Sequence, residues 1–503
     1  MRVAAPFERL TGTSQESRYA LSRWLFLRAL GIVYLIAFVS LWVQVEGLIG
    51  PDGILPAGTF LASVARRFGS DAVLLVPSVL WLGTSDAALH VVSALGVAAS
   101  LLLVLDVAPV LACLVAWVLY LSLQAVGGDF LAFQWDVLLL ETGLLAVLLA
   151  PRHLFPSRPP TAGPNAIAIV LLWFLLFRLT FESGAVKLTS GDPTWRNLTA
   201  LDYHFFTQPL PTWTAWYAHH LPDWLKHVAV VSTYALELVI PPLIFLGRRP
   251  RRIAFAGIVL LQLLIFGSGN YTFFNLLTVA LALLLLHDAD WRRLLPRRLV
   301  HQATRGGEET PPRRAPSPVS ALIGLPLLLM GVVSLYGTLA AGGAVPRPFQ
   351  PLFRMLEPFQ IVNSYGLFRV MTTKRHEIVV EGSADGLTWK PYEFRDKPGD
   401  PMRRPAFVEP HQPRLDWQMW FAALGRFETT PWFQAFLARL LQGSPDVAAL
   451  LATNPFPNGP PRYLRAQLYD YRFTSPEERR LSGAWWHREL LGSYGPVVSL
   501  SPQ

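Results

Sequence analysis

The chain has 503 residues, of which 52% are hydrophobic and 15% are charged, and its formal net charge is +9. This composition excludes an ordinary soluble protein and indicates an integral membrane protein. The excess positive charge is largely arginine between apolar runs, which is typical of a topology signal, so we expect no nucleic-acid partner. The single cysteine, Cys113, excludes an internal disulfide framework and thiolate metal or redox chemistry.

About nine apolar runs are candidates to cross the membrane as helices. At 1.5 Å per residue, a helix needs about 20 residues to cross a hydrocarbon core of roughly 30 Å. Between the first two runs, an amphipathic stretch with Arg66 and Arg67 and a short run at 72–82 are too short to cross, so we expect interfacial helices there. The expected spans are residues 24–46, 87–105, 107–125, 133–150, 166–182, 227–246, 253–267, 273–287 and 319–341.

The basic residues between these runs predict the orientation of the chain. With a cytoplasmic N-terminus, nine crossings place all the basic segments on the cytoplasmic side and everything after residue 346 on the exoplasmic side. Two glycosylation-type triplets, at Asn197 and Asn270, then fall outside. The basic segments are Arg18, Arg23 and Arg28, the link 151–160, the turn 247–252 and the stretch 292–318.

The last 155 or so residues predict a small mixed domain. Two runs rich in branched and aromatic residues flank Ala384-Asp385-Gly386, which is the chemistry of a β-hairpin turn, and RYLRAQLYDYRF predicts a further strand. LDWQMWFAALG and PWFQAFLARLLQG have helical periodicity and end at Gly425 and Gly443. The expected fold class is therefore an α-helical multi-pass membrane protein with a C-terminal exoplasmic mixed β/α domain.

These patterns divide the chain into four parts. We expect a membrane domain at 1–290 with an exoplasmic loop at 183–226, a cytoplasmic linker at 291–318, a final transmembrane helix at 319–345 and the exoplasmic domain at 346–503.

Several long strings resemble the lipase maturation factor family. They are SGAVKLTSGDPTWRNLTALDYHFFTQPLP at 183–211, FQWDVLLLETG at 133–143, NSYGLF at 363–368, IVVEGS at 378–383, PGDP at 398–401, RLDWQMWFAAL at 414–424 and LYDYRFT at 468–474. The resemblance implies a multi-pass protein of the endoplasmic reticulum membrane that helps secreted lipases reach an active fold. The composition also resembles that of a high-GC bacterial chain, for which the bacterial inner membrane is the expected location.

A more distant resemblance links the membrane domain to vitamin-K-dependent gamma-carboxylases. It rests on Gly184-Ala185-Val186-Lys187 and Asp192-Pro193-Thr194-Trp195. It implies that Lys187 acts as a base. The alternative function is therefore a membrane-embedded, carboxylase-like enzyme, although we expect a maturation factor that is not an enzyme and needs no cofactor.

Charged residues inside the apolar runs are the first candidate site. Arg178 and Glu182 are one helical turn apart and can pair, while Glu141 and Glu237 can complete a buried network near Lys187. One interpretation is structural, with paired charges that fix helix packing. The other gives the desolvated Lys187 amine a role in proton transfer.

Aromatic residues and histidines of the exoplasmic loop are the second candidate site. The aromatics form either an interfacial belt or a surface for exported client proteins, with membrane lipids as the other partner. Trp417 and Trp420 are spaced for core packing or client contact. No metal is expected, because His204, His219, His220 and His227, with Asp202 and Asp223, match no compact ligand motif. The client-binding candidates in the loop are Trp195, Tyr203, Phe205, Phe206, Trp213 and Trp216, with Tyr217 and Trp224 in the same group.

Overall fold

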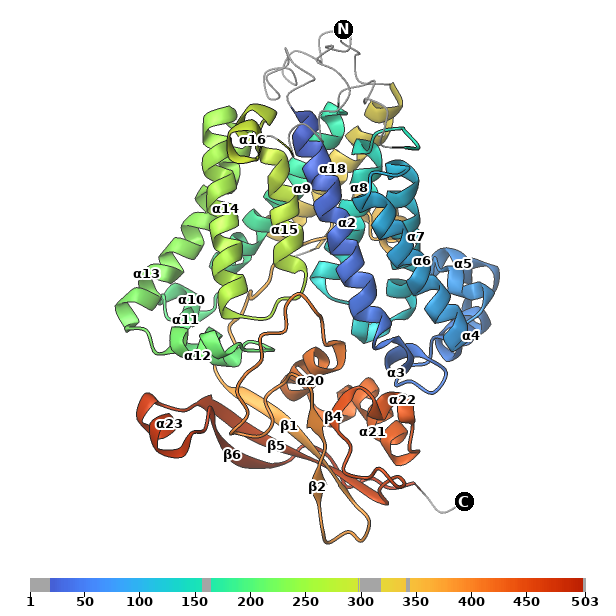
Figure 1. Ribbon diagram of the computed structural model, residues 1–503, viewed down its shortest axis with the longest axis vertical. Helices are drawn as coiled ribbons and strands as arrows, with labels where there is room; N and C mark the ends of the chain where they lie inside the picture. The colour runs from blue at the N-terminus through green and yellow to red at the C-terminus, as the bar shows by residue number, and fades with distance from the viewer. Residues whose placement is uncertain (1–18, 156–163, 297, 299–317, 341–343, 501–503) are drawn as a thin grey trace.

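A bundle of helices forms one part of the molecule, and a region of strands and short helices lies against one end of it (Figure 1). The computed structural model describes residues 19–155, 164–296, 298, 318–340 and 344–500. Arg18, part of the basic link and most of the expected cytoplasmic linker lie outside the described residues.

The bundle consists of long apolar helices with few charged side chains. Asn165 caps the longest of them, because its side chain accepts a hydrogen bond from Ile167 N at 3.1 Å. The long helices are α2 (Ala20–Trp42), α6 (Asp86–Val104), α7 (Pro109–Val126), α8 (Gln134–Leu149), α9 (Ala166–Thr189), α14 (Arg248–Ser268) and α18 (Pro318–Ala340). Two broken helices complete the bundle: α13 (Asp223–Tyr234) with η5 (Ala235–Val239) and η6 (Pro241–Phe245), and α15 (Phe274–Ala282) with η7 (Leu283–Leu285) and α16 (Asp288–Leu294).

Seven helices in the described part of the chain are long and apolar enough to cross a membrane. The bent pair formed by α15 and α16 raises that number to eight. The helix α8 has only 16 residues and falls short by length. The protein is therefore a multi-pass membrane protein.

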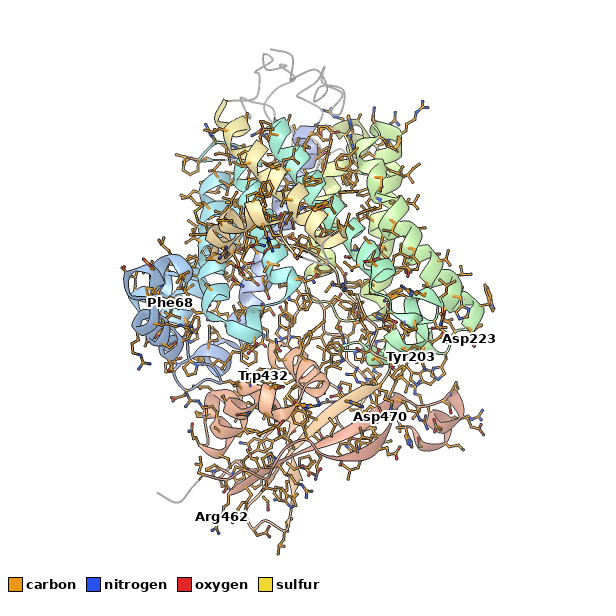
Figure 2. The ribbon with its side chains drawn as sticks, turned by 180° about the vertical axis from the view of Figure 1, so that it is seen from behind. Phe68, Tyr203, Asp223, Trp432, Arg462 and Asp470 are labelled. Atoms are coloured by element: carbon orange, nitrogen blue, oxygen red, sulfur yellow. The ribbon has the colours of Figure 1, made fainter. Side chains whose placement is uncertain are left out.

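Short helices lie between α2 and α6, as the sequence predicts. They are α3 (Val45–Ile49), α4 (Ala57–Phe68), η2 (Gly69–Asp71), α5 (Ala72–Leu75) and η3 (Val79–Leu82). The buried residues of α4 are Ala57 and Leu61, while Arg66 and Arg67 are exposed. Phe68 marks this group at the side of the bundle in Figure 2.

The helix α9 is longer than the sequence predicts, because Gly184 does not break it. A Cβ atom on Gly184 would lie 2.8 Å from the Glu237 Cβ. The glycine instead allows η5, which is a π-helical turn, to approach α9 closely. After α9, the chain forms α10 (Pro193–Arg196), α11 (Ala200–Thr207) and α12 (Trp213–His219) at the end of the bundle that faces the sheet (Figure 1).

An antiparallel sheet with strand order β2-β1-β5-β6 dominates the C-terminal region. The predicted hairpin forms between β1 and β2, where Gly386 has φ +78° and the Asp385 side chain accepts from two following backbone N–H groups. Both predicted helices form, whereas β6 had no clear signal in the sequence. The strands are β1 (Arg375–Ser383), β2 (Lys390–Pro391), β3 (Glu393–Phe394), β4 (Leu451–Thr453), β5 (Tyr463–Phe473) and β6 (Trp486–Ser493), and β3 pairs with β4. The helices are α20 (Arg414–Leu424), α21 (Pro431–Leu441), α22 (Pro445–Ala448) and α23 (Pro476–Ser482).

The segment between α18 and β1 does not lead directly to the sheet. It forms η8 (Arg347–Phe349), α19 (Gln350–Leu356) and η9 (Glu357–Phe359), and the chain then runs without regular structure until β1 begins. Residues 360–371, which we call the inserted segment, contact the middle of α8 and α9. One hydrophobic core includes residues of both the bundle and the C-terminal region, among them Leu139 and Phe433.

Candidate functional site

An ion pair in the middle of the bundle holds the start of the inserted segment. Arg178 of α9 pairs with Glu141 of α8, and both side chains are almost fully buried. The Arg178 Nη1 donates to the Asn363 carbonyl oxygen at 2.8 Å. The Glu141 Oε2 accepts from Asn363 N at 3.0 Å and from the Tyr365 hydroxyl at 2.8 Å. The pair therefore binds protein backbone on both of its charges.

Other side chains bind further backbone groups of the inserted segment. Glu182 Oε2 accepts from Tyr365 N at 2.8 Å, and Gln134 Oε1 accepts from Gly366 N at 3.2 Å. The Trp195 indole N–H donates to the Phe368 carbonyl at 2.9 Å. Non-helical backbone inside a membrane bundle is tolerated only when its polar groups find protein partners. These side chains supply them.

Asp192 holds the end of the inserted segment, just outside α9. Its Oδ2 accepts from Met371 N, and its Oδ1 accepts from Thr194 N at 2.7 Å. Partial burial by itself raises the pKa of Asp192, but these hydrogen bonds outweigh it and hold the pKa below its ordinary value. Asp192 is therefore ionised at neutral pH.

Lys187 forms a separate ion pair with Glu237 on the π-helical turn η5. Its Nζ lies 2.7 Å from both carboxylate oxygens, and both side chains are buried. An ammonium group that donates to a carboxylate has no lone pair to accept a proton. The charged residues that we expected in one network therefore form two clusters. One contains Lys187 and Glu237. In the other, Arg178 pairs with Glu141, and Glu182 binds the Tyr365 amide.

A buried ion pair that the sequence reasoning missed joins the two parts of the molecule. Arg414, the first residue of α20, forms two hydrogen bonds of 2.9 and 3.0 Å with Asp136 of α8. Arg414 also donates to the Phe130 carbonyl at 2.6 Å. Both residues lie in or next to strings that carry the family resemblance, which is the one signal that could have singled them out.

Comparison with known proteins assigns the chain to a family. Residues 21–293 match the lipase maturation factor transmembrane domain, and residues 361–496 match the lipase maturation factor C-terminal domain. The chain belongs to the lipase maturation factor family. The two matched domains meet at the inserted segment and at the Asp136–Arg414 pair.

Named relatives match nearly the whole chain. Lipase maturation factor 2 of Gallus gallus is 39% identical over 95% of this chain and 81% of the relative. Lipase maturation factor 2 of Homo sapiens is 39% identical over 95% of this chain and 83% of the relative, and lipase maturation factor 1 of Bos taurus is 37% identical over 95% and 89%. No solved structure matches the chain.

Part of the aromatic loop of this family member packs against its C-terminal sheet. Phe205 and Trp216 are buried in one cluster with Phe473, Trp485 and Trp486. Figure 2 shows Tyr203 at the bundle end that faces the sheet carrying Asp470. Trp213, Tyr217 and Trp224 remain 36%, 52% and 66% exposed.

The other aromatic candidates have partners inside the protein. Trp195 is buried beneath the inserted segment, and Trp417 is buried with its ring centroid 4.7 Å from that of Trp135. The Trp420 indole N–H donates to the Thr207 carbonyl at 2.8 Å. Buried rings present no open surface, so client binding stays a prediction that we carry forward on the exposed aromatics.

Two of the loop histidines, His204 and His220, bind different protein groups. His204 Nε2 lies 3.2 Å from the Tyr271 hydroxyl, and His220 Nδ1 lies 2.7 Å from the Trp216 carbonyl. Burial, together with the charge of Lys187, lowers the pKa of His204 to about 4, so it is neutral at neutral pH. Within the described residues, no three His, Cys, Asp or Glu side chains gather as a metal site.

Proposed function

We propose that the protein is a maturation factor that assists the folding or assembly of exported proteins, with lipases as the client class. The observation that carries this proposal is the match of both domains to proteins named as lipase maturation factors. No observation favours the carboxylase-like alternative, because the Lys187 ammonium is engaged by Glu237.

The proposal includes a topology with nine crossings, a cytoplasmic N-terminus and an exoplasmic C-terminal domain. The seven helices that are long and apolar enough to cross a membrane, which include the broken helix Asp223–Phe245, supply nine segments together with the bent pair and the short helix α8. The arginines at the start of α14 and in α16 lie at the end of the bundle opposite the sheet, which supports this orientation (Figure 1). The location is the endoplasmic reticulum membrane, or the inner membrane in a bacterium.

The loop helices and the C-terminal sheet form a joint surface for a client. Buried aromatics fix α11 and α12 on β5 and β6, and Trp213, Tyr217 and Trp224 remain exposed beside this junction. Large aromatic side chains offer apolar contact with polar edges, which suits a partly folded partner. The rigid junction keeps this aromatic edge next to the membrane.

The test is a combined variant in which Trp213, Tyr217 and Trp224 are each changed to Ser. We expect the amount of active lipase secreted per cell to fall about tenfold or more, because interface aromatics commonly contribute more than 1 kcal/mol each. The matched control is Phe60→Ser with Phe68→Ser, which changes exposed aromatics of α4. Full lipase activity from the first variant, at normal abundance, would contradict the proposed surface.

A further inference from the structure

A cluster of arginines occupies the end of the bundle opposite the C-terminal sheet, where α14 begins and α16 lies beside it (Figure 1). The two helices are joined by Asp290 of α16, whose Oδ1 lies 2.9 Å from Arg248 Nη2 and also pairs with Arg252. The exposed or half-exposed members of the cluster are Arg248, Arg249, Arg252, Arg292 and Arg293.

Within the part of the chain that the structure describes, nearby acidic side chains supply too little negative charge for these five arginines. Asp290 is shared by two of them. Among the described residues, Arg249, Arg292 and Arg293 have neither an ion-pair partner nor a side-chain hydrogen bond. The nearby Asp288 interacts electrostatically with Arg292 but forms no ion pair with it, and its Oδ1 accepts hydrogen bonds from Leu21 N at 3.0 Å and from Ser22 N at 3.2 Å.

One helix terminus adds to this positive potential. Both α2 and α14 begin at this end of the bundle (Figure 1), but the Asp288 carboxylate already binds the first N–H groups of α2. The N-terminus of α14, a helix of 21 residues, carries a partial positive charge of roughly half a unit. Arginines in the first turn of α14 are therefore unfavourable unless an anion lies close to them.

Exposed apolar side chains border the arginines. Leu246 precedes the cluster, Ile253 follows it on α14, and Leu294 follows Arg293 on α16, and their exposed fractions are 65%, 56% and 64%. A soluble anion would neutralise the arginines and leave these side chains in water. A phospholipid suits both the arginines and the apolar side chains, because its phosphate binds the guanidinium groups and its acyl chains cover the apolar rim.

We propose that this arginine cluster, defined by Arg248, Arg249, Arg252, Arg292 and Arg293, is a binding surface for anionic phospholipid in the adjacent leaflet. The lipid neutralises the arginines at the start of α14 together with those of α16. It thereby stabilises the end of the bundle where these two helices meet.

The experiment measures lipid binding to the full-length protein in neutral detergent. Phosphatidylglycerol and phosphatidylcholine of equal chain length are titrated, and binding is followed by native mass spectrometry and by the thermal unfolding temperature. We expect saturable binding and a higher unfolding temperature with phosphatidylglycerol only. The variant Arg249→Gln, Arg292→Gln, Arg293→Gln should bind about 100-fold more weakly, at about 1 kcal/mol per arginine.

A control variant with the same change of charge, Arg426→Gln, Arg462→Gln, Arg480→Gln, alters exposed arginines of the C-terminal region and should bind like the wild type. Equal binding of the two lipids, or undiminished binding by the first variant, would overturn the proposal. Displacement of the lipid by inorganic phosphate at millimolar concentration would also overturn it, because it would identify a soluble-anion site. No client is present, so the outcome is independent of the proposed maturation role.

Discussion

Lys187 and Glu237 illustrate the desolvation cost of burying two ions and the ion-pair geometry that offsets it. Both side chains are at least nine-tenths buried, and the Nζ lies 2.7 Å from each carboxylate oxygen. Taking two ions out of water costs several kcal/mol per ion, and the pair recovers this only when its geometry is good. Removing one partner leaves the other ion buried and alone.

We expect Lys187→Met to destabilise the purified protein by about 3–5 kcal/mol. The double variant Lys187→Met, Glu237→Met should recover most of that loss, because two apolar side chains leave no unpaired charge. Thermal unfolding in detergent checks both expectations. A double variant that is stable but fails to mature a client would instead support a chemical role for Lys187.

Glu409 is a buried carboxyl group between the C-terminal region and the start of α15. Its Oε1 accepts from Tyr271 N and from Asn275 Nδ2 at 3.2 Å, whereas its Oε2 is buried without a hydrogen-bond partner among the described residues. Burial raises the pKa of Glu409 to about 8. The folded protein therefore favours the neutral acid.

This raised pKa gives the stability a definite pH dependence. The stabilising contribution of Glu409 is complete below its ordinary pKa of 4.5 and is lost as the pH rises through about 8. The loss is on the order of 5 kcal/mol at full ionisation. Glu409→Gln should unfold at a higher temperature than the wild type at pH 9 and at a similar temperature near pH 5. Parallel pH curves for the two proteins would contradict this.

At the scale of elements, the inserted segment explains why charges stand inside the bundle. It has no helix or strand of its own, and Glu141, Arg178 and Glu182 bind its backbone. These side chains supply hydrogen-bond partners to its backbone, as a neighbouring strand does in a sheet. The stability of the inserted segment therefore depends on these side-chain hydrogen bonds.

Hydrogen exchange of the inserted segment tests this directly. A hydrogen bond to a charged group contributes about 1.5–3 kcal/mol, so Glu182→Ala should speed exchange of the Tyr365 amide by about 10- to 150-fold. Glu182→Gln keeps an acceptor at the same place and should exchange much more slowly than the alanine variant. An unchanged rate in Glu182→Ala would show that other contacts hold the segment.

The sequence predicted the elements whose signals are local. The β1–β2 hairpin follows from Asp385-Gly386, and α20 and α21 follow from helical periodicity. Strand β6 was not predicted, because it is an edge strand with mostly exposed residues and carries charges instead of a regular apolar alternation. The inserted segment has no periodicity, and its structure depends on partners far away in the chain.

The candidate residues could be found from local sequence, but their partners could not. A charge within an apolar run is conspicuous, so Arg178, Glu141 and Glu182 could be singled out. Their partners could not, because pairing is decided by which helices meet: Arg178 pairs with Glu141, 37 residues away in the sequence. Asp136 and Arg414 are 278 residues apart, and no local pattern connects them.

At the scale of the whole molecule, the bundle and the C-terminal region share one core and one buried ion pair. We expect Arg414→Ala to destabilise the protein by about 3–5 kcal/mol, because Asp136 then stays buried and unpaired. Arg426→Ala, which removes an exposed arginine of the same region, should have little effect. Thermal unfolding of the full-length protein checks the difference, and equal unfolding temperatures would refute the importance of the pair.

The residues of the bundle that bind the inserted segment are translated before the inserted segment itself. A ribosome makes Asp136, Glu141 and Arg178 long before it makes Asn363, Tyr365 and Arg414. Throughout that interval the bundle holds polar groups whose final partners do not yet exist. The membrane domain therefore cannot form its contacts with the inserted segment and with Arg414 until the C-terminal region has been translated.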